Sequence, residues 1–133
     1  MKSFEWFDGV FEGLGSWYEA TGRSQSYRVR HTNRRTDSGF EVTFRHDFDD
    51  GSVVEAHVTM LWTTEHLFSA SAAGKLLGNG YWIGEFCHYH LEVGPVVEVN
   101  LIPATNGLNV FGSSSRNKEG HYIAWHETLR RSQ

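Results

Sequence analysis

Histidines are the residues of this chain best suited to chemistry near neutral pH, and there are eight of them in 133 residues. Two stand in the sequence His88-Tyr89-His90. Because alternate residues of a β-strand share a face, these two imidazoles would point to the same side of a strand. Such a pair can bind one metal ion. The others are His31, His46, His57, His66, His121 and His126.

Three kinds of histidine chemistry remain open from the sequence. A metal site at His88 and His90 would take a further ligand from His31, His46, His126 or Glu92. A haem site would use one axial histidine in an apolar interior. Acid–base catalysis would pair an inward histidine with an acid, for which the candidates are Glu19, Glu55 and Glu85. Because rim or surface histidines bonded to their neighbours also explain the pattern, we expect no metal and no cofactor, and we name no catalytic residue.

Composition and charge exclude several function classes. The formal net charge is −4 and the pI is near 6.0, without a lysine-rich tract, so nucleic-acid binding is disfavoured. No stretch approaches the roughly 20 apolar residues of a membrane span. The single cysteine, Cys87, is interpreted as a buried, inert thiol. With no apolar leader and no disulfide, we expect a cytoplasmic protein.

Two hydrophobic periods divide the chain. Phe4, Phe7, Phe11 and Leu14 follow helical spacing, so residues 4–14 are predicted to form a short amphipathic helix. From Ser16 onward the period is two, which is typical of strands. The predicted strands are Ser16–Thr21, Ser26–Asn33, Gly39–Phe48, Ser52–Trp62, Glu65–Ala72, Tyr81–Leu91, Val96–Ile102, Leu108–Gly112 and His121–Leu129, with a short helix as the alternative for the last of them.

These elements predict an all-β fold in a single domain of residues 1–133. The hairpin signals at Asp49-Asp50-Gly51 and Asn106-Gly107, with short connections elsewhere, favour an antiparallel up-and-down barrel. We expect about eight to nine strands and one short N-terminal helix. A barrel of that size is either filled by side chains or holds one small ligand.

The apolar faces of the strands supply the candidate binding residues. They are bulky and aromatic, with a few polar groups among them, as in ligand cavities. The candidates are Trp17, Tyr27, His31, Phe44, His46, Met60, Trp62, Trp82, Phe86, His88, His90 and Trp125. For the strands at 81–91 and 121–129, the sequence does not decide which of the two alternating faces points inward. The opposite assignment would move every side chain of the strand to the other face.

The segment Gly15-Ser16-Trp17 resembles the G-x-W that opens the first strand in the calycin group, which includes lipocalins and fatty-acid-binding proteins. The resemblance implies an up-and-down barrel, small-molecule binding, and an arginine near the chain end, Arg130 or Arg131, packed on Trp17. The chain lacks paired cysteines and a T-D-Y segment, and the link at 22–25 is too short for the helical lid of fatty-acid-binding proteins. The pattern that remains is similar to a cytosolic, bacterial-type calycin barrel.

The sequence therefore predicts binding of a small hydrophobic or aromatic molecule inside the barrel. The alternative is a small enzyme of the isomerase, lyase or cyclase type that uses interior histidines, with or without a metal. A third hypothesis is an interaction module with a filled core. The expected partner is a small molecule, without nucleic acid or membrane, and the expected state is a monomer or homodimer.

Overall fold

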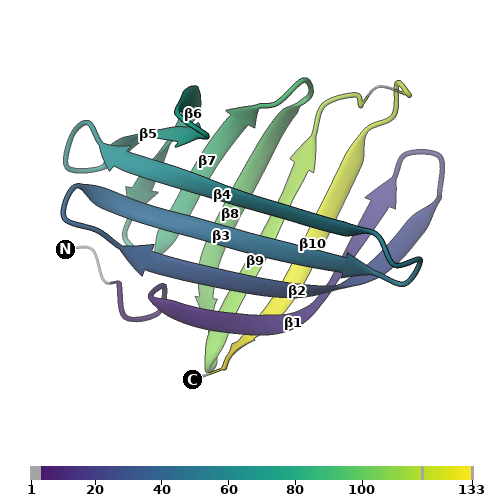
Figure 1. Cartoon of the computed structure of the whole chain (residues 1–133), viewed down its shortest axis with the longest axis horizontal. Helices are drawn as coiled ribbons and strands as arrows, with labels where there is room; N and C mark the ends of the chain where they lie inside the picture. Colours follow the sequence, from purple (N-terminus) through teal and green to yellow (C-terminus); the bar gives the residue numbers. More distant parts are fainter. Residues whose placement is uncertain (1–3, 118, 133) are drawn as a thin grey trace.

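Ten antiparallel strands form a closed barrel in the computed structural model, which describes residues 4–117 and 119–132. Each strand pairs with its neighbours in the chain, and β1 pairs with β10 to close the barrel. In Figure 1, β2, β3 and β4 cross in front of β8, β9 and β10 at a steep angle. The strands are β1 (Gly9–Glu19), β2 (Ser24–Arg35), β3 (Gly39–Phe48), β4 (Val53–Trp62), β5 (Leu67–Ala72), β6 (Lys75–Ile83), β7 (Phe86–Glu92), β8 (Val96–Ala104), β9 (Gly107–Ser114) and β10 (Ile123–Arg131).

The predicted N-terminal helix is wrong. Residues 5–7 form a single turn, with the N–H of Phe7 and of Asp8 donating to the carbonyl of Phe4, and no helix occurs among the described residues. From Gly9 the backbone joins the ladder between β2 and β10. Phe7 and Phe11 do reach the core, but Leu14 is 66% exposed. Closing the barrel needs the segment 9–19 as a strand, and this tertiary pairing outweighs the local helical spacing.

The predicted strand count of eight to nine is also wrong. The predicted strand 81–91 is divided at a turn over Gly84 and Glu85, where Gly84 has a φ of +60°. Its first part belongs to β6, which begins already at Lys75, in the interval between two of the predicted strands. Glycine adopts this left-handed conformation without a steric penalty, so the turn is local and tight.

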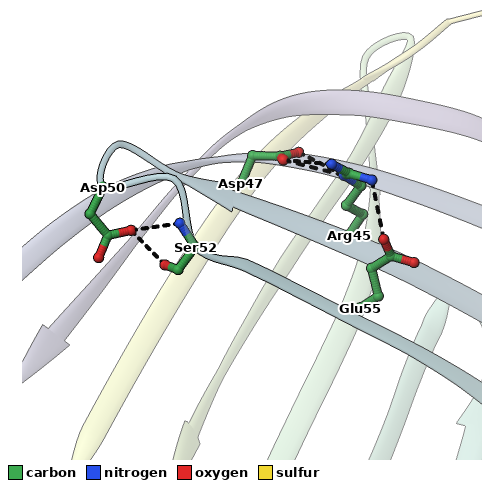
Figure 2. A network of polar contacts seen from close by, with 5 residues as sticks. All are labelled: Arg45, Asp47, Asp50, Ser52 and Glu55. Atoms are coloured by element: carbon green, nitrogen blue, oxygen red, sulfur yellow. Dashed lines mark hydrogen bonds and ion pairs between the residues drawn. The ribbon is translucent and has the colours of Figure 1, made fainter.

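The β3–β4 hairpin shows how the sequence encodes these connections. At its turn, the carboxylate of Asp50 accepts hydrogen bonds from the backbone N–H and the hydroxyl of Ser52, at 2.8 and 2.6 Å (Figure 2). Gly51 supplies the positive φ of +88°. On the outer face beside it, Arg45 pairs with Asp47 and with Glu55. The predicted hairpin is therefore present, and its outer face is polar and solvated.

One end of the barrel is closed by an aromatic plug. The N-terminal turn packs Phe4, Trp6 and Phe7 against Trp82, with ring centroids 4.8 to 5.4 Å apart. The remaining plug residues are Phe40, Trp62 and Phe68. Edge-to-face and tilted ring contacts of this kind stabilise aromatic clusters beyond their burial.

Arg131 fastens the N-terminal turn to the end of β10. Its guanidinium lies 4.7 Å from the ring centre of Phe11 and donates to the backbone carbonyls of Glu5 and Asp8. The implied packing of a C-terminal arginine on Trp17 is wrong. Arg23 covers the Trp17 ring instead, at 5.2 Å, because Trp17 lies at the opposite end of β1 from Arg131.

In the described part of the chain, no helix is long and apolar enough to cross a membrane.

Candidate ligand-binding site

A pocket of about 250 Å³ opens inside the barrel at the end opposite the plug. Its rim comes from the ends of β1, β3, β4 and β10, which place Trp17, Phe48, Val54 and Ile123 around the opening. The walls are almost wholly apolar, as is usual for small-molecule sites. The other lining residues are Tyr27, Phe44, His46, Val97 and Trp125.

A smaller cavity of about 80 Å³ continues this pocket toward the barrel centre. Four residues line both spaces: Phe44, His46, Val97 and Trp125. The inner cavity adds His31, Tyr89, Leu91, Val99, Val110 and Glu127. The two spaces together form a funnel with apolar walls and a polar inner end.

Glu127 is the charged group at that inner end, and only 1% of its surface is exposed. The hydroxyl of Tyr27 donates to its Oε2 at 2.8 Å, and Nε2 of His46 lies 3.2 Å from the same oxygen without hydrogen-bond alignment. Its Oε1 lies 3.7 Å from Nε2 of His31 and has no hydrogen bond within the described structure. On the other side of its ring, His31 contacts Asn33 through Nδ1 and Oδ1, at 3.3 Å.

The cluster shifts the pKa values of its members in different directions. Burial alone would raise the pKa of Glu127, but the adjacent His46, His31 and Tyr27 outweigh it and hold the pKa below its ordinary value. Burial lowers the pKa of His31, which favours the neutral ring. Burial and the neighbouring carboxylate raise the pKa of Tyr27. Near neutral pH the site therefore holds an ionised Glu127, a neutral His31 and a neutral Tyr27.

The missing side chain of Gly15 makes room for this cluster. Gly15 lies between Tyr27 on β2 and Glu127 on β10 in the strand register. A Cβ at this position would stand 2.6 Å from the Tyr27 ring and 2.9 Å from Cγ of Glu127. The glycine of the G-x-W segment is thus required for space, since its φ is not in the left-handed region.

Six of the twelve candidate binding residues meet at the funnel. They come from four strands, β1, β2, β3 and β10, and they are Trp17, Tyr27, His31, Phe44, His46 and Trp125. Met60, Trp62 and Trp82 also face inward but lie toward the plugged end, where Trp62 and Trp82 belong to the aromatic plug.

The remaining three candidates lie on the outer face of β7. Cys87, Tyr89 and Leu91 are buried and face inward, so alternation turns Phe86, His88 and His90 outward, contrary to the sequence-based expectation. The ring of His88 lies tilted beside that of Tyr81, at 5.0 Å between ring centres, and its Nδ1 lies 2.8 Å from Oδ1 of Asn100. The cause is the turn at 84–85, which pairs Trp82 with Cys87. After this turn the odd-numbered residues face inward, whereas before it Trp82 does.

The sequence interpretation missed Glu127. Glu19, Glu55 and Glu85 were the candidate acids, but Glu55 and Glu85 are exposed, and Glu19 lies at the barrel end against Thr21 and His121. A signal was present, because Trp125 was placed inward and residue 127 shares its face in a strand. Within the described residues, no cluster of three or more histidine, cysteine or acidic side chains is arranged to hold a metal ion.

Comparison with known proteins shows the fold. No family model and no curated protein sequence matches the chain. Among solved structures, the S-type phycobiliprotein lyase from Guillardia theta aligns with a TM-score of 0.78 and 12% identity, over 98% of this chain and 90% of that one. A designed fluorescence-activating β-barrel aligns with a TM-score of 0.46 and 16% identity, over 96% and 95% of the two chains. The expected antiparallel up-and-down barrel is therefore confirmed, and the structure of the lyase shares this fold.

Proposed function

We propose that this protein binds a small, mostly apolar, ring-containing molecule inside its barrel. The observation that carries the proposal is the funnel, which is open at one end and mostly apolar, with walls from Phe44, Val97 and Trp125. Its charged group, Glu127, lies at the inner end. The likeness to the phycobiliprotein lyase supports it through the shared barrel, an architecture that can enclose one small ligand. The outer part, about 250 Å³, lies just below the usual range for ligand pockets and suits a molecule of two or three rings.

Titration with N-phenylnaphthylamine, a neutral dye that fluoresces in apolar surroundings, tests this function. We expect saturable binding by the wild-type protein and a melting temperature that rises with dye concentration. Val97→Trp would fill the space common to both cavities and abolish binding, because Val97 lines both.

The matched control is Val53→Trp on the outer face of β4, where the side chain is 44% exposed. This variant should bind the dye as the wild type does, while circular dichroism confirms that both variants keep the barrel. Equal binding by the wild type and Val97→Trp would place the dye elsewhere and contradict the proposal.

A second candidate function is acid–base catalysis in the same pocket. The observation that favours it is the contact of His46 and Glu127 at the end of an apolar cavity. Nitrobenzisoxazole is a suitable probe, because a base that removes its ring C–H proton breaks the N–O bond and releases a coloured phenolate. We expect turnover that Glu127→Gln and His46→Ala abolish and that His126→Ala, at an exposed position, leaves unchanged. A rate equal to that in buffer would exclude this candidate.

A further inference from the structure

Two hydrogen-bond acceptors face each other at the inner end of the funnel without a donor between them. The Nδ1 of His31 contacts the amide oxygen of Asn33, which is an acceptor, so the ring proton of neutral His31 belongs on Nδ1. The other nitrogen, Nε2, then presents a lone pair to Oε1 of Glu127, at 3.7 Å. Both side chains line the inner cavity.

The two oxygens of Glu127 differ in their surroundings. Oε2 receives the Tyr27 hydroxyl and lies beside His46. Oε1 has no hydrogen bond within the described residues, although Glu127 is almost fully buried. A buried carboxylate oxygen without a donor is costly, and a donor brought by a ligand would remove that cost.

The described cavity walls supply no lysine or arginine for this oxygen. None of the residues that line the two spaces is a lysine or an arginine. Phe44 and Trp125 present aromatic rings to the same space, and such rings also attract cations. The site therefore has the chemistry of a receptor for a positively charged or strongly donating nitrogen.

We infer that the ligand carries an amino group, or another cationic N–H donor, which binds Glu127 Oε1 and His31 Nε2 while its rings lie between Phe44, Val97 and Trp125. The inference rests on the proposed binding function and specifies its ligand class. The contact would be a charge-assisted hydrogen bond between apolar walls, the strongest type that the pocket can make. A carboxylate or phosphate ligand would instead meet the charge of Glu127 with no lysine or arginine among the lining residues to offset it.

Three probes with one ring system test this inference: naphthylmethylamine, naphthylmethanol and naphthoic acid. Calorimetric titration of the wild-type protein at neutral pH should give an affinity for the amine at least roughly tenfold above that for the alcohol, since hydrogen bonds to charged groups are the stronger ones. The acid should bind most weakly.

Glu127→Gln should remove the preference for the amine while retaining the alcohol, whose binding shows that the pocket survives. The matched control is Glu98→Gln on the outer face, whose side chain is 55% exposed, and it should behave as the wild type. As a measurement that needs no variant, the carbon-13 carboxyl resonance of Glu127 in the wild-type protein should shift on addition of the amine and not on addition of the alcohol.

The outcomes separate the inference from the function on which it rests. Binding of all three probes with similar affinity, or preference for the acid, would overturn the amine inference and leave the binding function intact. An amine preference that Glu127→Gln leaves unchanged, or an unmoved Glu127 resonance, would also overturn it. Failure of all three probes and of the neutral dye to bind would overturn both.

Discussion

Gly15 shows how a single residue controls the interior polar cluster. The Tyr27 ring and the Glu127 side chain meet directly over its Cα, in space that any side chain would occupy. Gly15→Ala should therefore displace the hydrogen bond between them and destabilise the protein by about 1–3 kcal/mol, the usual cost of an overpacked core. Urea unfolding measures the change.

The control for this substitution is Ser16→Ala, one position further along β1. Its unfolding free energy should stay within about 0.5 kcal/mol of the wild type, as for most substitutions away from such features. Equal stability of Gly15→Ala and the wild type would show that Tyr27 and Glu127 can move apart without cost.

Tyr27 secures one oxygen of the buried carboxylate. Tyr27→Phe keeps the ring but removes the hydroxyl that donates to Glu127. We expect a loss of about 1–3 kcal/mol, because a buried acceptor then loses its donor. The comparison is Tyr18→Phe, whose exposed ring should make the change neutral in the same denaturation experiment. An unaffected Tyr27→Phe protein would mean that the carboxylate finds another donor.

The buried His31 and Glu127 both make the free energy of unfolding decrease as the pH falls. Both have a pKa below its ordinary value in the folded protein, so the unfolded chain binds protons more readily and unfolding becomes easier as the pH falls. The His31 contribution is lost as the pH drops below about 6.5, and the Glu127 contribution below about 4.3.

Unfolding free energies measured from neutral to acidic pH check this dependence. His31→Asn should make the decline below about pH 6.5 shallower than in the wild type, because it removes the first group to titrate. His126→Asn, at an exposed position, should reproduce the wild-type slope. A slope unchanged by His31→Asn would assign the decline to other groups.

Among the structural elements, the N-terminal turn has an effect beyond its length of a few residues. Phe7 is fully buried between Phe40 and Trp82, at 5.3 and 5.2 Å between ring centres. Phe7→Ala should cost about 3–5 kcal/mol of unfolding free energy, the range for large core truncations. Leu14→Ala, on an exposed position of β1, should cost less than about 0.5 kcal/mol. Similar losses in both variants would show that the plug is not part of the core.

The same elements show what the sequence could and could not specify. Period-two alternation located most strands, and the turn at 49–51 formed where its residues favour one. The helical spacing of Phe4, Phe7 and Phe11 was misleading, because a turn followed by a strand also directs Phe7 and Phe11 into the core and packs Phe4 against it. Nothing local distinguishes the two, since the deciding interaction is the pairing of β1 with β10, over a hundred residues away.

The residues of the candidate site were predictable where they lie on strands with clear alternation, and not where they depend on turns or on barrel closure. Trp17, Tyr27 and Phe44 lie on strands with clear alternation, and the structure brings them to one funnel. The sequence could not show which face of β7 points inward, because that depends on a two-residue turn inside a segment predicted to be one continuous strand. The hydrogen bond between Tyr27 and Glu127 depends on barrel closure, which brings together two residues that are 100 positions apart in the sequence.

Across the whole molecule, closure of the barrel should make unfolding cooperative. Cys87 faces the interior with no exposed surface, and burial raises the pKa of its thiol. We expect iodoacetamide to modify it only when the whole barrel opens, so that the modification rate rises with urea in proportion to the unfolded fraction. Intrinsic fluorescence followed in the same solutions supplies the comparison. Modification at a rate independent of urea would indicate a local opening near β7.

The difference between the two ends of the barrel has a kinetic consequence. One end is packed with the rings of Phe7, Phe40 and Trp82, and the other is rimmed by Trp17 and Phe48. A molecule in such a blind channel leaves by the route through which it entered, and a second one cannot push it out from behind. Exchange of occupants is therefore sequential, with a residence time that does not shorten when a competitor is added in excess.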